Sequence, residues 1–127
     1  MSITKMGTTT FAEYSAQQEA KNNIALAVLG HTYALCEALE HNFEEQYDRS
    51  DYEFYPETGR KYHKIVMQDI RGGRSVHCFI DKQTGEVYKS ASWKAPAKGV
   101  RYDLRIIEQR EWLLANADWA GGYLYRK

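Results

Sequence analysis

Residues 62–91 read YHKIVMQDIRGGRSVHCFIDKQTGEVYKSA, and this stretch decides the fold because it holds two consecutive hairpin patterns. The runs Tyr62–Ile70 and Ser75–Asp81 are rich in strand-forming residues. Between them, Gly72-Gly73 supplies the positive φ angles of a two-residue hairpin turn. A second turn ends in Gly85 and leads into a third strand over Val87–Ala91. The stretch therefore predicts an antiparallel sheet.

A two-residue turn at Gly72-Gly73 also predicts the register of the first hairpin. The predicted opposing pairs are Lys64 with Asp81, Ile65 with Ile80, Val66 with Phe79 and Met67 with Cys78, and the same register places His63 across from Lys82 and His77 across from Gln68. The apolar face expected to cover the helices carries Ile65, Met67, Val76, Cys78 and Ile80. Because adjacent strand residues point to opposite faces, His77 and Cys78 are expected to point apart.

Upstream of the hairpins, residues 11–47 have apolar positions at helical spacing. Gly30 divides this segment into two helices in one interpretation, and a single long helix bent near Gly30 is the alternative. Residues 1–10 are polar and predict a flexible arm, and residues 48–61 predict a connecting loop.

Downstream, residues 92–105 read SWKAPAKGVRYDLR and connect the third strand to the last helix. Apolar residues alternate over 100–106, which favours a strand, but a helical stripe begins in the same place. The compromise is a short strand over 100–102, a helix over 103–119 capped by Asp103, and a tail over 120–127. One α+β domain over 1–127 is predicted: an N-terminal helix or helix pair packed on a small antiparallel sheet of three to four strands over 62–102, followed by a C-terminal helix.

The 127-residue chain has no apolar run of the roughly 18 residues that a membrane span needs, and MSITKMGTTT is not built like a signal peptide. We therefore expect a cytoplasmic protein with no membrane partner. Its two cysteines have no recognisable spacing, so reduced thiols are expected.

The net charge of zero hides a strong partition. Residues 1–59 carry a net charge of −7 and residues 60–105 carry +7. One interpretation is that the acidic and basic halves screen each other inside the fold. The other is that part of the basic half stays open to a phosphate-bearing or acidic partner.

No catalytic, metal or cofactor motif is recognised. The four histidines do not converge in the predicted register, and metal sites need clustered ligands. Gly72 and Gly73 join two strands, so they do not form a phosphate-cradling loop before a helix. No catalytic residue, metal ligand or cofactor is therefore assigned.

The binding candidates lie in the basic, aromatic central region, where cations that neutralise phosphates alternate with rings that stack on bases. These candidates are Arg71, Arg74, Lys89, Trp93, Lys94, Lys98, Arg101, Tyr102 and Arg105.

Two parts of the chain are similar to a known family: residues 75–104 and the ending ADWAGGYLY. Residues 75–104 contain a D-x-x-T-G turn at Asp81–Gly85 and the run W-K-A-P-A-x-G-V-R at Trp93–Arg101. They resemble a family of small uncharacterised proteins encoded by tailed bacteriophages. The resemblance leaves the N-terminal helices outside and implies no catalytic residue. It implies a protein made inside an infected bacterial cell.

Three functions from different classes follow. The first is a non-enzymatic phage accessory protein whose basic sheet-and-loop face binds a nucleic acid, a nucleotide, or an acidic host or defence protein. The second is a protein-interaction or assembly module, a homo-oligomer for example, that uses its acidic helices and exposed tyrosines. The third is an enzyme of unknown class, ranked last because no nucleophile, base and orienting group can be assembled.

Overall fold

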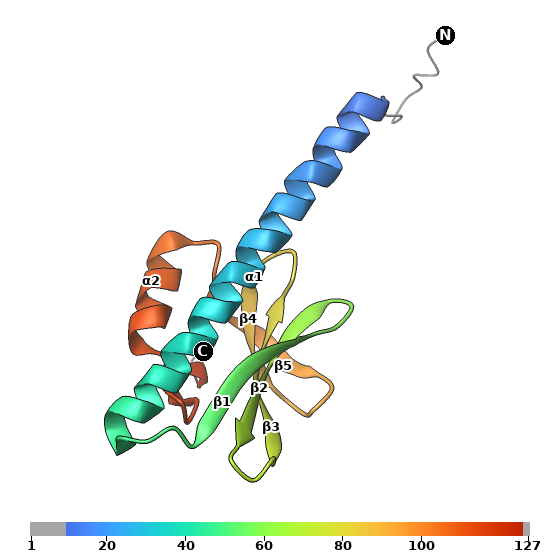
Figure 1. Ribbon diagram of the computed structural model, residues 1–127. Helices are drawn as coiled ribbons and strands as arrows, with labels where there is room; N and C mark the ends of the chain where they lie inside the picture. Colours follow the sequence, from blue (N-terminus) through green and yellow to red (C-terminus); the bar gives the residue numbers. More distant parts are fainter. Residues whose placement is uncertain (1–9, 126–127) are drawn as a thin grey trace.

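The computed structural model describes residues 10–125, so the predicted arm over 1–10 lies almost wholly outside the described residues. A long helix, α1 (Phe11–Tyr47), precedes the sheet, and a second helix, α2 (Ile107–Asn116), and a short 3-10 helix, η1 (Gly122–Leu124), follow it. The strands are β1 (Tyr52–Thr58), β2 (Tyr62–Asp69), β3 (Arg74–Asp81), β4 (Glu86–Ser90) and β5 (Pro96–Asp103). They form one antiparallel sheet in sequence order (Figure 1). The α+β class is confirmed, with five strands in place of three to four.

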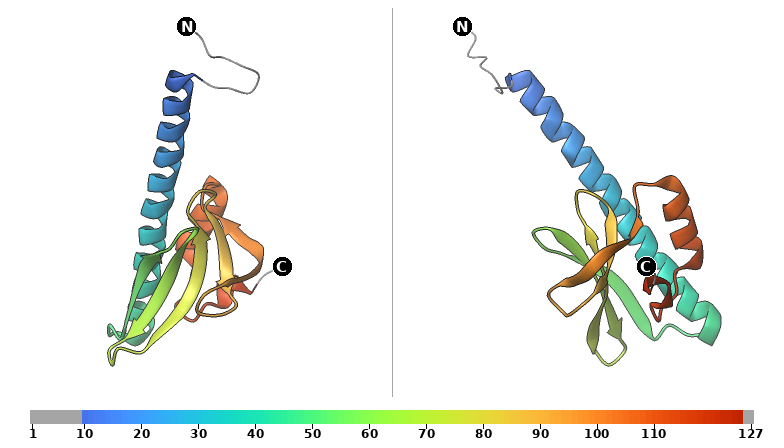
Figure 2. Two further views of the ribbon diagram at one scale, coloured as in Figure 1. Left: turned by 90° about the vertical axis from the view of Figure 1, so that its right-hand side faces the viewer. Right: turned by 180° about the vertical axis from the view of Figure 1, so that it is seen from behind.

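Both helices pack on one face of the sheet, and the first half of α1 projects beyond it (Figure 2). Val28 is the first buried residue along α1, and the buried positions that follow recur at helical spacing. The core lies between this stripe, α2 and the helix-side face of the sheet. It includes Val28, Leu35, Leu39, Ile65, Cys78, Ile80, Val87, Leu104 and Leu113.

The helix α1 runs without a break. It begins with a capping box, in which the Thr10 hydroxyl accepts from the Glu13 N–H (3.1 Å) and the Glu13 carboxylate accepts from the Thr10 N–H (2.9 Å). It ends at Asp48, whose φ of 53° is left-handed. Gly30 lies inside it, between the buried Val28 and Thr32. The division into two helices was therefore wrong, and the alternative of a bent single helix is confirmed only as far as the single helix.

The predicted loop over 48–61 is also wrong, because it contains β1. Pro56 and the acidic residues in this segment hid its alternation, in which Phe54 packs in the core while Glu53 and Tyr55 point to the other face. A proline is compatible with an edge strand, since no further strand needs its missing N–H. On the open edge of β1, the Phe54 N–H donates to the Glu40 carboxylate of α1 (2.8 Å).

The predicted register of β2 with β3 is wrong: it is off by two residues as far as Ile65, which pairs with Cys78 and not with Ile80, and by three from Val66 on. The turn is wider than Gly72-Gly73 alone, because Oδ1 of Asp69 accepts from the N–H groups of Arg71 (2.8 Å) and Gly73 (2.9 Å). A four-residue loop over 70–73 results. The predicted pairs of Lys64, Val66 and Met67 change accordingly, to Phe79, Val76 and Ser75. Of the predicted apolar face, Ile65, Cys78 and Ile80 lie in the core.

A β-bulge turns His77 toward the helix side. Cys78 pairs with Ile65 and Val76 pairs with Val66, which leaves His77 as the extra residue. Its ring lies edge-on to Phe54 (5.4 Å between centroids) and stacks on Tyr123 (5.6 Å), both of which belong to the core. The expectation that His77 and Cys78 point to opposite faces is therefore wrong.

The second hairpin forms as predicted. Oδ1 of Asp81 accepts from the N–H groups of Gln83 (2.8 Å) and Thr84 (3.0 Å), and Gly85 adopts a φ of +76°. This turn joins β3 to β4 and sets Phe79 opposite Tyr88.

The strand after residue 95 is longer than predicted, and the last helix is shorter. β5 runs to Asp103, and α2 starts only at Ile107, with Ile106 as N-cap and no side-chain cap. Asp103 does not cap this helix: its carboxylate accepts from the Arg105 N–H (2.8 Å), and its own N–H donates to Gln109 (2.7 Å). The alternating pattern prevails because it buries Tyr102 and Leu104.

The predicted tail packs as η1. Gly121 adopts a φ of +85°, and Tyr123 and Leu124 are buried in the core. Within the described part of the chain, no helix combines the length and the apolar character needed to span a membrane.

Candidate nucleic-acid interface

The sheet face opposite the helices carries a cluster of cations and aromatic rings that begins at Lys64. In the observed register, Lys64 pairs with Phe79 and Phe79 with Tyr88, so their side chains share this helix-free face. The β4–β5 loop brings Trp93 over the same face. Nζ of Lys64 lies 4.1 Å from the centre of the Trp93 ring.

A second cation, from β3, reaches the same ring. Cζ of Arg74 lies 4.9 Å from the centre of Trp93. Trp93 keeps 39% of its surface exposed. Both contacts are cation–π interactions, worth about 0.5–1 kcal/mol each at exposed sites. The ring and both cations are therefore held together at a surface that a ligand can reach.

Next to Lys64 lies a pocket of about 180 Å³ at the β1–β2 hairpin. Three cations line it, Arg60, Lys61 and Lys64, with Tyr62 and Phe79 as its aromatic walls. Nζ of Lys61 lies 5.4 Å from the centre of the Tyr62 ring. Lysine and arginine side chains around a small hollow provide the donors that a phosphate group needs. We call Arg60, Lys61, Tyr62, Lys64, Arg74, Phe79 and Trp93 the basic aromatic track.

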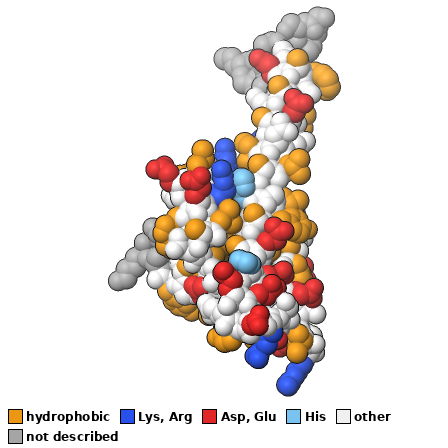
Figure 3. Space-filling view, turned by 60° about the vertical axis from the view of Figure 1, so that its left-hand side comes forward, with side chains coloured by type: hydrophobic (Ala, Val, Ile, Leu, Met, Phe, Trp, Pro, Cys, Tyr) orange, Lys and Arg blue, Asp and Glu red, His pale blue; other side chains and the backbone are white. Residues whose placement is uncertain are grey.

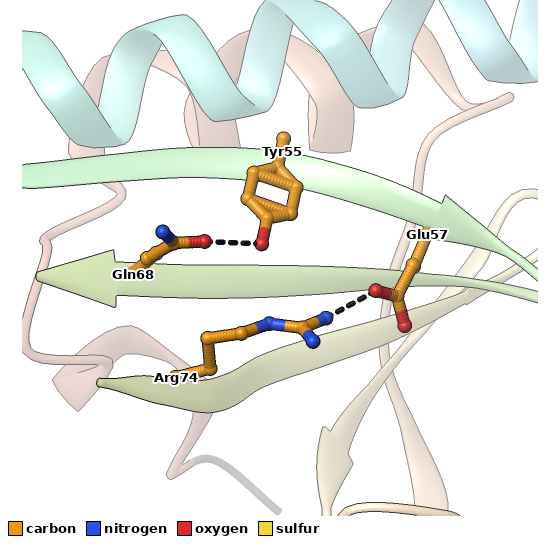
Figure 4. A network of polar contacts seen from close by, with 4 residues as sticks. All are labelled: Tyr55, Glu57, Gln68 and Arg74. Carbon is orange, nitrogen blue, oxygen red and sulfur yellow. Dashed lines mark hydrogen bonds and ion pairs between the residues drawn. The ribbon is translucent and has the colours of Figure 1, made fainter. Parts of the chain in front are cut away.

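Among the described residues, one carboxylate lines this pocket, and it is paired. Glu57 forms an ion pair with Arg74, and beside it the Tyr55 hydroxyl donates to Oε1 of Gln68 (2.6 Å) (Figure 4). These contacts fix side chains of β1, β2 and β3 in place. Arg74 is thus positioned by Glu57 while its guanidinium lies against Trp93.

The tyrosine at the centre of this face stays neutral. Burial, with the nearby Glu86, raises the pKa of Tyr88 to about 12, and its hydroxyl donates to Oε1 of Glu86 (3.1 Å). Its phenol therefore adds no negative charge near the track at neutral pH.

The structure separates the nine residues that the sequence suggested. Arg74 and Trp93 belong to the track. Arg71, Lys94, Lys98 and Arg105 are exposed on turns, a loop or β5. Among the described residues, none of their side chains forms an ion pair or a cation–π contact with a residue of the track.

The other three hold the C-terminal segment. Arg101 donates from Nε to the Leu124 carbonyl (2.7 Å), Nζ of Lys89 lies 4.7 Å from the Tyr125 ring centre, and Tyr102 is only 3% exposed. The Tyr102 hydroxyl donates to the Tyr123 carbonyl (2.6 Å). Arg101 and Tyr102 therefore have structural roles.

Sequence reasoning missed Arg60, Lys61, Tyr62 and Lys64. The first two fell in the predicted loop, and the wrong register set Lys64 against Asp81 instead of Phe79. The alternation of Tyr62, Lys64 and Val66 was the available signal, because residues two apart on a strand share a face.

The carboxylates of α1 lie on the helix side. Carboxylates gather there (Figure 3), and Glu37 and Glu45 line a groove between α1 and α2. The track is on the other side of the sheet from these helices. The separation of charge is partial, because Glu57 of β1 lies on the track side, where it pairs with Arg74. The carboxylates of this groove are separated from Lys64 and Arg74 by the sheet.

The buried polar groups beneath the sheet are not prepared for catalysis. Burial lowers the pKa of His77 to about 4 and raises that of Cys78 well above its ordinary value. A neutral imidazole beside a protonated thiol is not an activated nucleophile. Within residues 10–125, no three His, Cys, Asp or Glu side chains gather as a metal site would require.

The comparisons with known proteins give a family but no function. A family model described as a family of unknown function (DUF7717) matches residues 11–126. The chain belongs to DUF7717. No curated protein and no solved structure matches it. The DUF7717 match spans every helix and strand of the fold and every residue of the track, and its description names neither a source nor an activity.

Proposed function

We propose that this DUF7717 protein is a non-enzymatic binding protein that holds single-stranded nucleic acid on the basic aromatic track. The observation that supports it is the placement of Lys64 and Arg74 against one exposed ring, Trp93. Proteins that bind single strands without sequence preference combine a cationic surface with stacking rings in this way. A nucleotide is the smallest ligand of the same chemistry.

Different residues of the track bind the phosphates and the bases in this proposal. The pocket with Arg60, Lys61 and Lys64 takes a backbone phosphate, and Trp93 and Tyr62 take the faces of neighbouring bases. The face is an open sheet surface, so a flexible single strand can follow it, whereas a rigid duplex would touch it at few points.

The biological setting is part of the proposal. The D-x-x-T-G and W-K-A-P-A-x-G-V-R resemblance supports an accessory protein of a tailed bacteriophage that acts in the infected cell. Trp93 lies within this motif and in the track, which links the resemblance to the proposed binding face.

The test is binding of a labelled single-stranded oligonucleotide of about 12 nucleotides, followed by fluorescence anisotropy from about 50 to about 200 mM salt. We expect the logarithm of affinity to fall linearly with the logarithm of salt concentration. R60A/K61A/K64A should lose about tenfold or more in affinity at low salt and about 2 units of this slope, since each phosphate contact with a single strand contributes about 0.7.

The matched control removes three exposed cations outside the track, in K21A/R49A/R105A. It should bind like the wild-type protein. Absence of binding at the lowest salt, or an equal loss in this control, would refute the track. Equal affinity for a duplex would refute the stacking of bases on Trp93 and Tyr62. Binding to an acidic polypeptide but not to the oligonucleotide would mean that the partner is an acidic protein.

A second candidate function is protein interaction through α1, and one observation favours it. The first turns of α1 project beyond the sheet (Figure 1). Phe11 is 84% and Tyr14 53% exposed. Large apolar side chains left bare in this way are typical of interaction sites when they form a patch. Sedimentation at rising concentration tests the homo-oligomer form: a monomer at every concentration would rule it out, and an oligomer lost in F11S/Y14S would support it.

A further inference from the structure

A second hollow lies on the helix side of the sheet, where the C-terminal segment crosses β3 and β4. Its volume is about 400 Å³, and its walls include Met67, His77, Lys89, Ser90, Trp119 and Tyr125. That volume lies in the range of about 300–1,000 Å³ typical of small-molecule sites.

The hollow is separate from the track. Met67 pairs with Phe54, and Lys89 pairs with Cys78, and both partners belong to the core on the helix side. Paired residues share a face, so Met67 and Lys89 lie on the side opposite Lys64. A ligand here is therefore a different ligand, and its binding does not depend on the proposed function.

The charge of the hollow is positive. Lys89 is the one charged residue among the described residues that line it, and no carboxylate is among them. Ser75 and Ser90 also line it, with the Ser90 hydroxyl donating to the Val76 carbonyl (3.4 Å), and Nζ of Lys89 lies 4.7 Å from the ring centre of Tyr125. An ammonium in a hollow without carboxylates is suited to a single anionic group.

The opposite wall is apolar and rigid. Trp119 contributes its ring, and its position is fixed by hydrogen bonds from its N–H to Oδ1 of Asn42 (3.0 Å) and from Nε1 to Oε1 of Gln46 (3.3 Å). It also stacks on Tyr52 (5.5 Å between centroids). A fixed aromatic wall reduces the conformational entropy that the protein loses when a ligand binds, because the site is already ordered.

The floor is fixed as well. Nε2 of His77 hydrogen-bonds to the Tyr123 hydroxyl (2.7 Å), and the imidazole is neutral at physiological pH. Gly121, whose φ is +85°, closes one side of the hollow: a Cβ added to it would lie in van der Waals contact with Cε1 of His77 (3.6 Å). The polar floor thus carries no charge that would repel or compete with an anion near Lys89.

We propose that this hollow binds a small organic anion, a carboxylate or monophosphate attached to a flat apolar body. The anionic group lies beside Lys89 and Ser90, and the body lies against Trp119 and Met67. Phenyl phosphate is a suitable probe, since it combines the two parts. Inorganic phosphate and benzyl alcohol each carry one part alone.

The test is titration of the ¹⁵N-labelled full chain, followed by amide chemical shifts. Phenyl phosphate should move the amides of Ser90, Ala120 and Gly121 saturably, with an affinity at least about tenfold above that of either single-part probe. Lys89→Met should weaken phenyl phosphate about tenfold or more, because it removes a charge-assisted contact, whereas Lys98→Met on the exposed part of β5 should not.

R60A/K61A/K64A should keep the phenyl phosphate affinity, which separates this site from the track. Shifts that are absent at millimolar probe, or equal with benzyl alcohol, would overturn the anion site. Equal binding of inorganic phosphate would overturn the apolar part. A wild-type response in Lys89→Met would overturn the assignment of the ammonium.

Discussion

Nζ of Lys64 lies 4.1 Å from the centre of the Trp93 ring, although the two residues are 29 positions apart and one is on β2 and the other in the β4–β5 loop. This contact makes the helix-free face a cationic and aromatic surface. It also makes Trp93 a reporter of anything that displaces the ammonium or stacks on the ring.

Trp93→Leu is expected to weaken oligonucleotide binding by about tenfold or more, because stacking of one base on one ring is worth about 1–3 kcal/mol. Oligonucleotide should quench the tryptophan fluorescence of the wild-type protein, and the variant should lose this response. Trp112→Leu is the control, since Trp112 stacks on Tyr102 outside the track (5.5 Å between centroids). Wild-type affinity in Trp93→Leu would contradict the stacking role.

The sheet could be predicted where local chemistry determines it. The Gly85 turn and the positions of β3 and β4 along the chain follow from short-range features, and they were predicted correctly. β1 escaped detection because Pro56 and its acidic neighbours resemble a loop, and the proline is tolerated only because β1 is an edge strand. That edge position is a property of the whole sheet.

The site could be predicted only in part, for a similar reason. Trp93 and Arg74 were predicted from composition, but the register that adds Lys64 depends on the Asp69 carboxylate, which widens the turn. Tyr102 looked like a ligand-binding ring because the segment that buries it lies 21 residues away. Such long-range contacts leave no local pattern.

Tyr102→Phe is expected to lower the free energy of unfolding by about 1–2 kcal/mol. The substitution removes the hydroxyl that donates to the buried Tyr123 carbonyl (2.6 Å), and a buried acceptor that loses a hydrogen bond costs free energy. The stacked contact with Trp112 should survive. Urea unfolding measures the loss, and unchanged oligonucleotide binding by the folded variant would support the placement of Tyr102 outside the track. An undiminished stability would contradict the role of this hydrogen bond.

Acid should destabilise the fold through His77. Burial lowers its pKa from 6.5 to about 4, against a smaller opposing effect of Asp118, so below pH 6.5 the unfolded chain binds a proton that the folded chain does not. The contribution is fully present above pH 6.5 and is lost as the pH falls toward 4. The contribution of His77 to the free energy of unfolding amounts to as much as about 3 kcal/mol. His63 is also buried, and burial lowers its pKa too, so it acts in the same direction.

The double variant His77→Phe/Tyr123→Phe tests this assignment. It keeps aromatic rings against Phe54 and avoids an unpaired Tyr123 hydroxyl. Urea unfolding at a series of pH values should show a shallower loss of stability between pH 6.5 and 4 than in the wild-type protein. The same slope in both proteins would mean that His77 does not carry the acid sensitivity.

Two glycine substitutions should have opposite effects. Gly30→Ala should raise the free energy of unfolding by about 0.5–1 kcal/mol, because Gly30 lies inside α1, is exposed, and has nothing within 4 Å of its missing Cβ. Gly85→Ala should lower it by about 1 kcal/mol or more, since its φ is +76° and the added Cβ would lie 3.0 Å from Cγ of Arg105. Thermal unfolding of both variants measures the contrast. A loss in Gly30→Ala would indicate that α1 is bent or broken at that residue after all, because only then would a glycine be needed there.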